Sequence, residues 1–170
     1  MEYSDVLLTI AEVATAFAGF TGLISALRHK DESRLALSAW QLRGIIENCL
    51  FAIGFALLPI LLRSYGIAGT DCWQISSAVL LPSWLVAAAL ALRRLRLAVG
   101  SSIFGEFPTS MTVSAIFFIV FACALSVNIS GAFPPLAAAL YLTGLVCPLF
   151  TACIPFLVFV TLSFTGQAED

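Results

Sequence analysis

The stretch VLLTIAEVATAFAGFTGLISAL, residues 6–27, decides the fold of this chain. It is apolar or small throughout, apart from three threonines, one serine and a single acid, Glu12. An α-helix needs roughly 20 predominantly apolar residues to cross a hydrocarbon core of about 30 Å. The stretch therefore predicts a membrane-spanning helix with one carboxylate inside it.

The composition of the whole chain favours the same interpretation. Of its 170 residues, 61% are hydrophobic and only 11% are charged, whereas charged residues make up about a quarter of an ordinary soluble domain. The apolar residues form long runs, unlike the alternating segments of roughly ten residues in an outer-membrane barrel. We therefore predict an all-α, polytopic integral membrane protein, with residues 1–170 forming a single transmembrane domain.

Five apolar runs predict a bundle of five transmembrane helices. Their expected bounds are 6–27, 42–62, 73–92, 110–130 and 136–164. Residues 35–43 could continue the second helix along the membrane surface, and Pro82 predicts a kink in the third. The fifth run is longer than one straight crossing needs but too short for two, which favours a single tilted or broken helix. The alternative to five spans is four, with one apolar run forming an interfacial or broken helix instead of crossing.

Basic residues predict the orientation, because Lys and Arg gather in cytoplasmic connections. Most lie in the first and third connections, which contain Arg28, Lys30, Arg34 and Arg43, and Arg93, Arg94 and Arg96. With five crossings, this places the N-terminus outside and the C-terminus in the cytoplasm. The small size suggests the bacterial inner membrane. We expect the Arg93–Arg94–Arg96 cluster to touch anionic lipid headgroups, and three basic residues in a short loop do not predict nucleic-acid binding.

Glu12 is the first candidate functional residue, because a carboxylate inside a spanning helix is costly. At helical spacing it shares a face with small residues, among them Thr15, Gly19 and Gly22, while bulky residues such as Phe20 lie opposite. Small residues at this spacing favour close helix packing. Two interpretations stay open: Glu12 lines an ion or proton path in an oligomer, or it is a neutral packing residue bonded to Thr15 or to another helix.

Two further polar residues lie within the predicted spans. Glu47 follows Arg43 by four residues, which predicts an ion pair on one helix face at the inner membrane surface. Because the first two helices should run antiparallel, Glu12 and Glu47 are expected at different depths and should not share a metal ion or a proton. Asn128, near the outer end of the fourth run, is a candidate for polar contacts between helices.

The sequence has no pattern typical of an enzyme. It contains one His and no CxxC pair, which leaves no metal-ligand set, and it lacks a nucleophile elbow and a phosphate-binding glycine loop. We therefore predict no enzymatic activity, no cofactor and no metal.

Two functional hypotheses remain, and both have the lipid bilayer as a partner. The first is an oligomeric channel or transport-type protein, formed from copies of this chain, in which Glu12 sets the ion preference. The alternative is a non-conducting structural or interaction subunit that packs with other membrane subunits in a larger complex.

Overall fold

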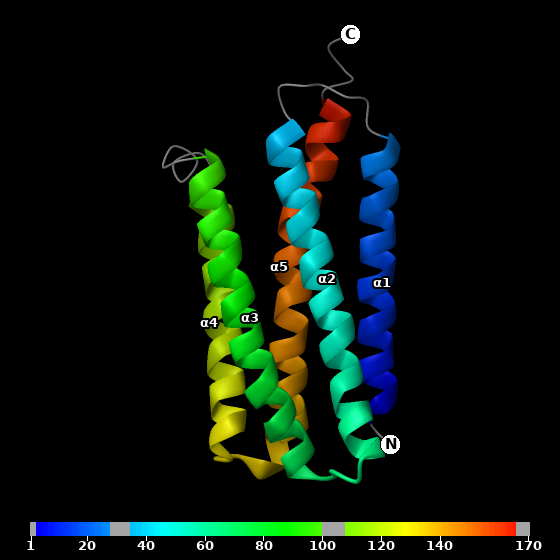
Figure 1. Cartoon of the computed structure of the whole chain (residues 1–170), viewed down its shortest axis with the longest axis vertical. Coiled ribbons are helices and arrows are strands. Elements are labelled where there is room, and N and C mark those ends of the chain that lie inside the picture. The colour runs from blue at the N-terminus through cyan, green and yellow to red at the C-terminus, as the bar shows by residue number, and fades with distance from the viewer. Residues whose placement is uncertain (1–2, 28–34, 100–107, 166–170) are drawn as a thin grey trace.

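Helices make up the secondary structure of the described part of the chain, which covers residues 3–27, 35–99 and 108–165 of this computed structural model. In chain order they are α1 (Ser4–Leu27), α2 (Leu35–Ser64), α3 (Thr70–Val99), α4 (Pro108–Ser130), the short 3-10 helix η3 (Pro134–Leu136) and α5 (Ala137–Thr165). Figure 1 shows the long helices side by side, with consecutive helices running in opposite directions. The all-α prediction is confirmed for these residues.

In the part of the chain that the structure describes, four helices are long and apolar enough to cross a membrane, which indicates a membrane location. The candidate spans are Ser4–Leu23, Leu42–Ser64, Thr70–Arg94 and Pro134–Cys153. In α4 the apolar stretch found within the described residues, Ala115–Ser130, is shorter. The structure thus supports four membrane-length helices directly, whereas a fifth crossing by α4 stays a prediction.

The helices extend beyond most of the predicted spans. Residues 35–43 do not form a separate surface segment, because α2 begins at Leu35 and continues as one helix to Ser64. The third helix continues to Val99, seven residues past its predicted end. The fifth is also one α-helix, although it contains Pro148 and Pro155.

α5 occupies the centre of the bundle and contacts each of the other α-helices. On one side of it α1 packs against α2, and on the other α3 packs against α4 (Figure 1). Figure 1 also shows α3 and α4 leaning away from α2 and α5 toward the end at which α3 finishes. The fully buried large side chains include Leu7, Ile45, Leu80, Phe121, Leu125, Tyr141 and Leu145.

Two glycines determine how α4 meets its neighbours. Gly131 ends the helix with φ 68°, a left-handed conformation that a residue with a Cβ adopts only with strain. Gly144 on α5 lies against Leu125 of α4, and a Cβ added there would come within 2.6 Å of Leu125 Cδ2. The absence of a side chain at Gly144 therefore lets α4 and α5 approach closely.

Candidate functional site

Glu12 lies on α1 with its side chain exposed on the outside of the bundle. At 1.5 Å per residue it is roughly 12 Å along the helix from Ser4, near the middle of the 20-residue candidate span Ser4–Leu23. Within the described residues, no hydrogen bond or ion pair involves its carboxylate. The acid is therefore an outward-facing group at the centre of an apolar helix.

The small residues around Glu12 also face outward. Thr15, Gly19 and Gly22 are exposed, and a Cβ added at either glycine would meet nothing within 4 Å. The buried residues of α1 belong to a different face, formed by Leu7, Ile10, Ala14 and Thr21. Phe20, on the bulky side predicted from the sequence, is 61% exposed. The predicted bulky side is thus partly turned inward, since Ile10 is buried and Phe17 packs against the core, whereas the small-residue face is left open.

Thr15 does not pair with Glu12 in this structure. Its hydroxyl donates a hydrogen bond of 2.8 Å to the carbonyl of Ala11, one helical turn earlier. This arrangement is common for Thr in membrane helices, because the hydroxyl can donate its hydrogen bond to a backbone carbonyl of the same helix. Among the described residues no side chain pairs with the Glu12 carboxylate, so its partner stays a prediction.

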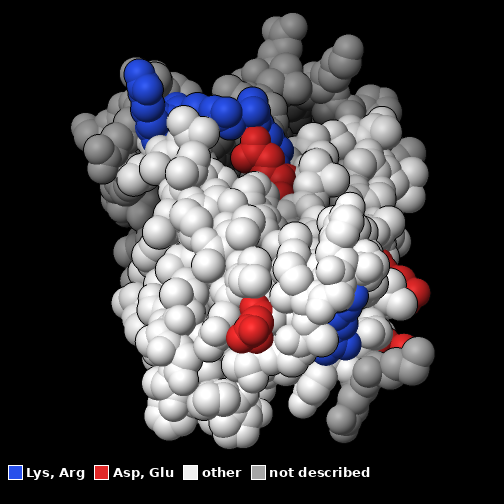
Figure 2. Space-filling model, turned by 60° about the horizontal axis from the view of Figure 1, so that its bottom comes forward, with Lys and Arg blue, Asp and Glu red and all other residues white. Residues whose placement is uncertain are grey.

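Glu47 is held by two arginines at the end of the bundle where α3 finishes. Arg43 Nε lies 2.6 Å from Glu47 Oε1, so the ion pair that the i, i+4 spacing predicts is present. Arg94 Nη1 from α3 also lies 3.3 Å from Glu47 Oε1, a contact that local spacing in the sequence does not predict. Figure 2 shows basic side chains crowded around acidic atoms at one end of the molecule. The predicted contact of Arg96 with lipid concerns a side chain outside the described part of the structure.

Glu12 and Glu47 lie at different levels of the bundle. Arg63, near the end of α2, stacks over Trp73, whose ring contacts Tyr3 just before α1. From this common level Glu12 is roughly 13 Å along α1, whereas Glu47 is roughly 24 Å along α2, at 1.5 Å per residue. The structure therefore does not bring the two carboxylates together.

Asn128 of α4 links three helices through its buried side-chain amide. Its Nδ2 donates to Ser77 Oγ on α3 at 2.8 Å and to the carbonyl of Ala137 on α5 at 3.0 Å, with a longer contact of 3.4 Å to the Trp73 carbonyl. Because carbonyls only accept, the nitrogen rather than the oxygen of the amide must face this side. Asn128 is 2% exposed, so these bonds act as a buried cross-link.

Trp73 stands where segments from all five α-helices meet. Its ring lies beneath the Arg63 guanidinium of α2, 5.2 Å from the ring centroid, and beside the rings of Tyr3 and Tyr141, at 5.8 and 5.6 Å. Its carbonyl faces Asn128 of α4. Trp73 is 5% exposed. We refer below to the Trp73 cluster, meaning Trp73, Tyr3, Arg63, Asn128 and Tyr141.

A proline in α2 explains the hydrogen bond of Tyr141. Pro59 lacks an N–H, so it cannot bond the carbonyl of Phe55 four residues earlier. The Tyr141 hydroxyl of α5 donates to that carbonyl at 2.5 Å. This pair does not follow from the sequence: Pro59 marks a carbonyl that needs a donor, but the donor is 86 positions away from Phe55 and cannot be located by local spacing.

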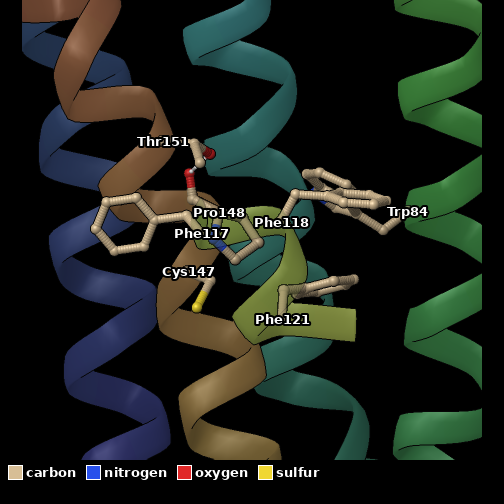
Figure 3. A pocket seen from close by; sticks show the side chains of 7 residues that line it. All are labelled: Trp84, Phe117, Phe118, Phe121, Cys147, Pro148 and Thr151. Carbon is tan, nitrogen blue, oxygen red and sulfur yellow. Dashed lines mark hydrogen bonds between the residues drawn. The ribbon is translucent and has the colours of Figure 1, made fainter. Parts of the chain in front are cut away.

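An aromatic pocket lies between α3, α4 and α5, and Figure 3 shows its lining. The residues around it are Trp84, Phe117, Phe118, Phe121, Cys147, Pro148 and Thr151. Trp84 contacts Phe118 and Phe121, with ring centroids 5.2 and 4.8 Å apart. The Thr151 hydroxyl donates to the Pro148 carbonyl at 2.8 Å. This lining therefore offers an apolar surface rather than a route for ions.

Metal-binding side chains do not gather in the described residues: no group of three or more His, Cys, Asp or Glu lies close enough to hold an ion. The polar groups instead divide into three sets: the exposed Glu12 face (Glu12, Thr15, Gly19 and Gly22), the Glu47 triad (Glu47, Arg43 and Arg94) and the Trp73 cluster. Comparison with known proteins adds no further assignment, since no protein-family model, curated protein or solved structure matches this chain.

Proposed function

We propose that this chain is an integral membrane protein that works as an oligomer assembled through the Glu12 face of α1, which comprises Glu12, Thr15, Gly19 and Gly22. In this proposal it is a channel or transport-type protein whose ion path runs between subunits. The observation that carries the proposal is the exposure of Glu12 near the middle of an apolar candidate span.

An exposed carboxylate at that position is unfavourable in a lone subunit. A charged side chain at the centre of a membrane helix costs about 2.5–3.5 kcal/mol on insertion scales. Glu12 has no described partner within its own chain, so water or another subunit is needed to relieve that cost. Assembly through this face would supply another subunit and room for water, because it removes Glu12 from lipid and encloses it with other polar groups.

The residues around Glu12 suit such an assembly. Gly19 and Gly22 leave the α1 backbone open to close approach, and small residues at helical spacing are typical of membrane helix interfaces. The described interior of one subunit gives no comparable route, because its buried Asn128 and Tyr141 groups are hydrogen-bonded and its pocket is aromatic. A ring of Glu12 carboxylates would favour cations.

Flux through liposomes tests the conducting part of this proposal. Wild-type protein should carry K⁺ or H⁺ faster than empty liposomes, and Glu12→Gln should lower the rate at least about tenfold because it removes the charge that attracts cations. Asp5→Asn is the matched control, since Asp5 lies two turns earlier on the same face but at the start of the helix. No flux above empty liposomes under any cation, anion or proton gradient would contradict conduction.

Sedimentation equilibrium in detergent tests the assembly itself. Gly22→Leu should shift the wild-type oligomer toward monomer, because the new side chain separates the helices that meet there. Gly54→Leu is the control, since Gly54 is likewise exposed and open, but lies on α2. A strictly monomeric wild-type protein would contradict the proposal.

A non-conducting interaction subunit is the second candidate. The open Gly19 and Gly22 surface favours it equally, because such a surface packs against any complementary membrane helix. Assembly that depends on Gly22 but produces no flux would select this candidate over the channel.

The proposed location is the bacterial inner membrane, with the Glu47 end in the cytoplasm. Arg43, Arg93 and Arg94 lie toward this end, and basic residues favour the cytoplasmic side. The N-terminus would then be outside and the C-terminus inside. A periplasmic reporter enzyme fused after Asp170 should be inactive, and an active fusion would reverse the orientation.

A further inference from the structure

The Glu47 triad carries a net positive charge, because two arginines pair with a single carboxylate. Arg43 and Arg94 approach the same atom, Glu47 Oε1, at 2.6 and 3.3 Å. Two guanidinium groups therefore share one carboxylate, and their donor nitrogens can be no farther apart than the sum of those distances. One of the two positive charges is not balanced by Glu47, and it lies on the parts of the guanidinium groups that face away from that carboxylate.

The two guanidinium groups also keep unused donors. Each carries five N–H groups in a fixed fork, and the described contacts engage only Arg43 Nε and Arg94 Nη1. The side chains are 59% and 47% exposed. Forked donors of this kind match the oxygens of a phosphate group, so the pair can bind one anion between α2 and α3.

The position of the pair selects which phosphate it meets. Arg43 is the second residue of the candidate span Leu42–Ser64, and Arg94 is the last residue of Thr70–Arg94. Both therefore lie where an apolar span gives way to the headgroup layer, in which lipid phosphates are concentrated. Arg93 is also exposed beside Arg94 and adds to the local positive charge.

We propose that Arg43 and Arg94, drawn together by Glu47, form a clamp for the phosphate of one anionic lipid headgroup. The site bridges α2 and α3 and does not involve the Glu12 face of α1, so it goes beyond the oligomeric function proposed above. Glu47 acts in it as a positioning residue. A lipid bound there would hold α2 and α3 together at the end where α3 and α4 lean outward (Figure 1).

Native mass spectrometry in an uncharged detergent tests the clamp with phosphatidylglycerol as the probe. Wild-type protein should retain one tightly bound lipid in preference to zwitterionic phosphatidylcholine. Arg43→Gln and Arg94→Gln should each weaken retention roughly fivefold, the effect of one basic residue near an anionic surface. Arg63→Gln, at the opposite end of α2, should leave it unchanged.

A double-variant cycle distinguishes a clamp from independent surface charges. If both arginines hold one phosphate, the combined variant should lose less than the product of the two single losses. The corresponding Lys variants retain the charge and the fold but lack the fork, and should still bind less tightly than wild type.

Three results would overturn the proposal: multiplicative losses in the double variant, wild-type retention by both Lys variants, or an equal loss with Arg63→Gln. A further arm adds inorganic phosphate at millimolar concentration. Displacement of the lipid by that ion would show a general anion site and refute the headgroup assignment.

Discussion

The two ends of the bundle are held together by different chemistry. At one end, the Trp73 cluster joins all five α-helices through edge-on and tilted ring contacts and through hydrogen bonds from the buried Asn128 and Tyr141. At the other end, the Glu47 triad joins α2 to α3 through half-exposed ions. The hydrogen bonds of the buried Asn128 and Tyr141 side chains have little water to compete with them, whereas exposed ion pairs contribute only about 0–1 kcal/mol. We therefore expect the Trp73 end to be the rigid one.

Two cysteines allow this difference to be measured. Cys72 lies beside Trp73, and Cys49 lies two residues after Glu47; both are fully buried. In chains that keep only one of them, with the other cysteines replaced by Ala, the rate of maleimide labelling reports opening of one end alone. The wild-type protein should label more slowly at Cys72 than at Cys49, and the reverse order would contradict the comparison.

The largest effect is expected from Trp73→Ala. Removing a buried Trp side chain leaves a cavity and costs about 4 kcal/mol, and here it also removes the surface that Tyr3, Arg63 and Tyr141 share. Unfolding by SDS in mixed micelles should show this loss, together with much faster labelling of Cys72. Trp73→Phe is the matched control and should retain most of the stability, since a ring still fills the site.

Asn128→Ala should have the next largest effect, about 2 kcal/mol. The variant leaves the Ala137 carbonyl and the Ser77 hydroxyl without their donor in a buried site. The same unfolding assay measures it, with Ser126→Ala as a control because Ser126 is exposed on the same helix. Equal losses in the two variants would mean that the buried amide is no better a link than a surface hydroxyl.

Tyr141→Phe should cost about 1 kcal/mol, since it removes only the donor to the Phe55 carbonyl. Pro59→Ala restores an N–H that can bond the same carbonyl within α2. In the Pro59→Ala background, Tyr141→Phe should therefore have almost no further effect on unfolding. If Tyr141→Phe lowers the free energy of unfolding equally in both backgrounds, the tyrosine hydroxyl does not compensate for the proline.

Glu47→Gln should have the smallest effect on stability, below about 1 kcal/mol, because the ions it pairs are exposed. It should speed labelling of Cys49 and leave Cys72 unchanged. Added salt should reduce the difference from wild type, since screening already weakens the pairs. A loss as large as that of Asn128→Ala would remove the contrast between the two ends.

Local patterns in the sequence predicted the features that depend on neighbouring residues. The apolar runs predicted the helices, because a segment in lipid must form all its backbone hydrogen bonds within itself. The i, i+4 spacing gave the contact between Arg43 and Glu47. Asn128 was a candidate for helix contacts, although its acceptors, Ser77 and Ala137, could not be named in advance. Contacts between distant segments depend on how the helices pack, which spacing does not encode.

α1 illustrates the limit of such patterns most clearly. Its small residues and its bulky residues define two opposite faces, and either could have packed inward. Packing instead buries a face that overlaps the bulky side at Ile10 and also contains Leu7, Ala14 and Thr21, because α2 and α5 contact the helix there.

Local sequence patterns were thus enough to establish that the chain is helical, that its helices are long enough for a membrane, and that α1 has one carboxylate near its middle. Only the tertiary structure decided that this carboxylate faces outward, that Arg94 joins Arg43 at Glu47, and that Trp73 lies where five helices meet. The reason is physical: helix formation depends on hydrogen bonds within about four residues, whereas the direction of each helix face is fixed by the helices packed around it.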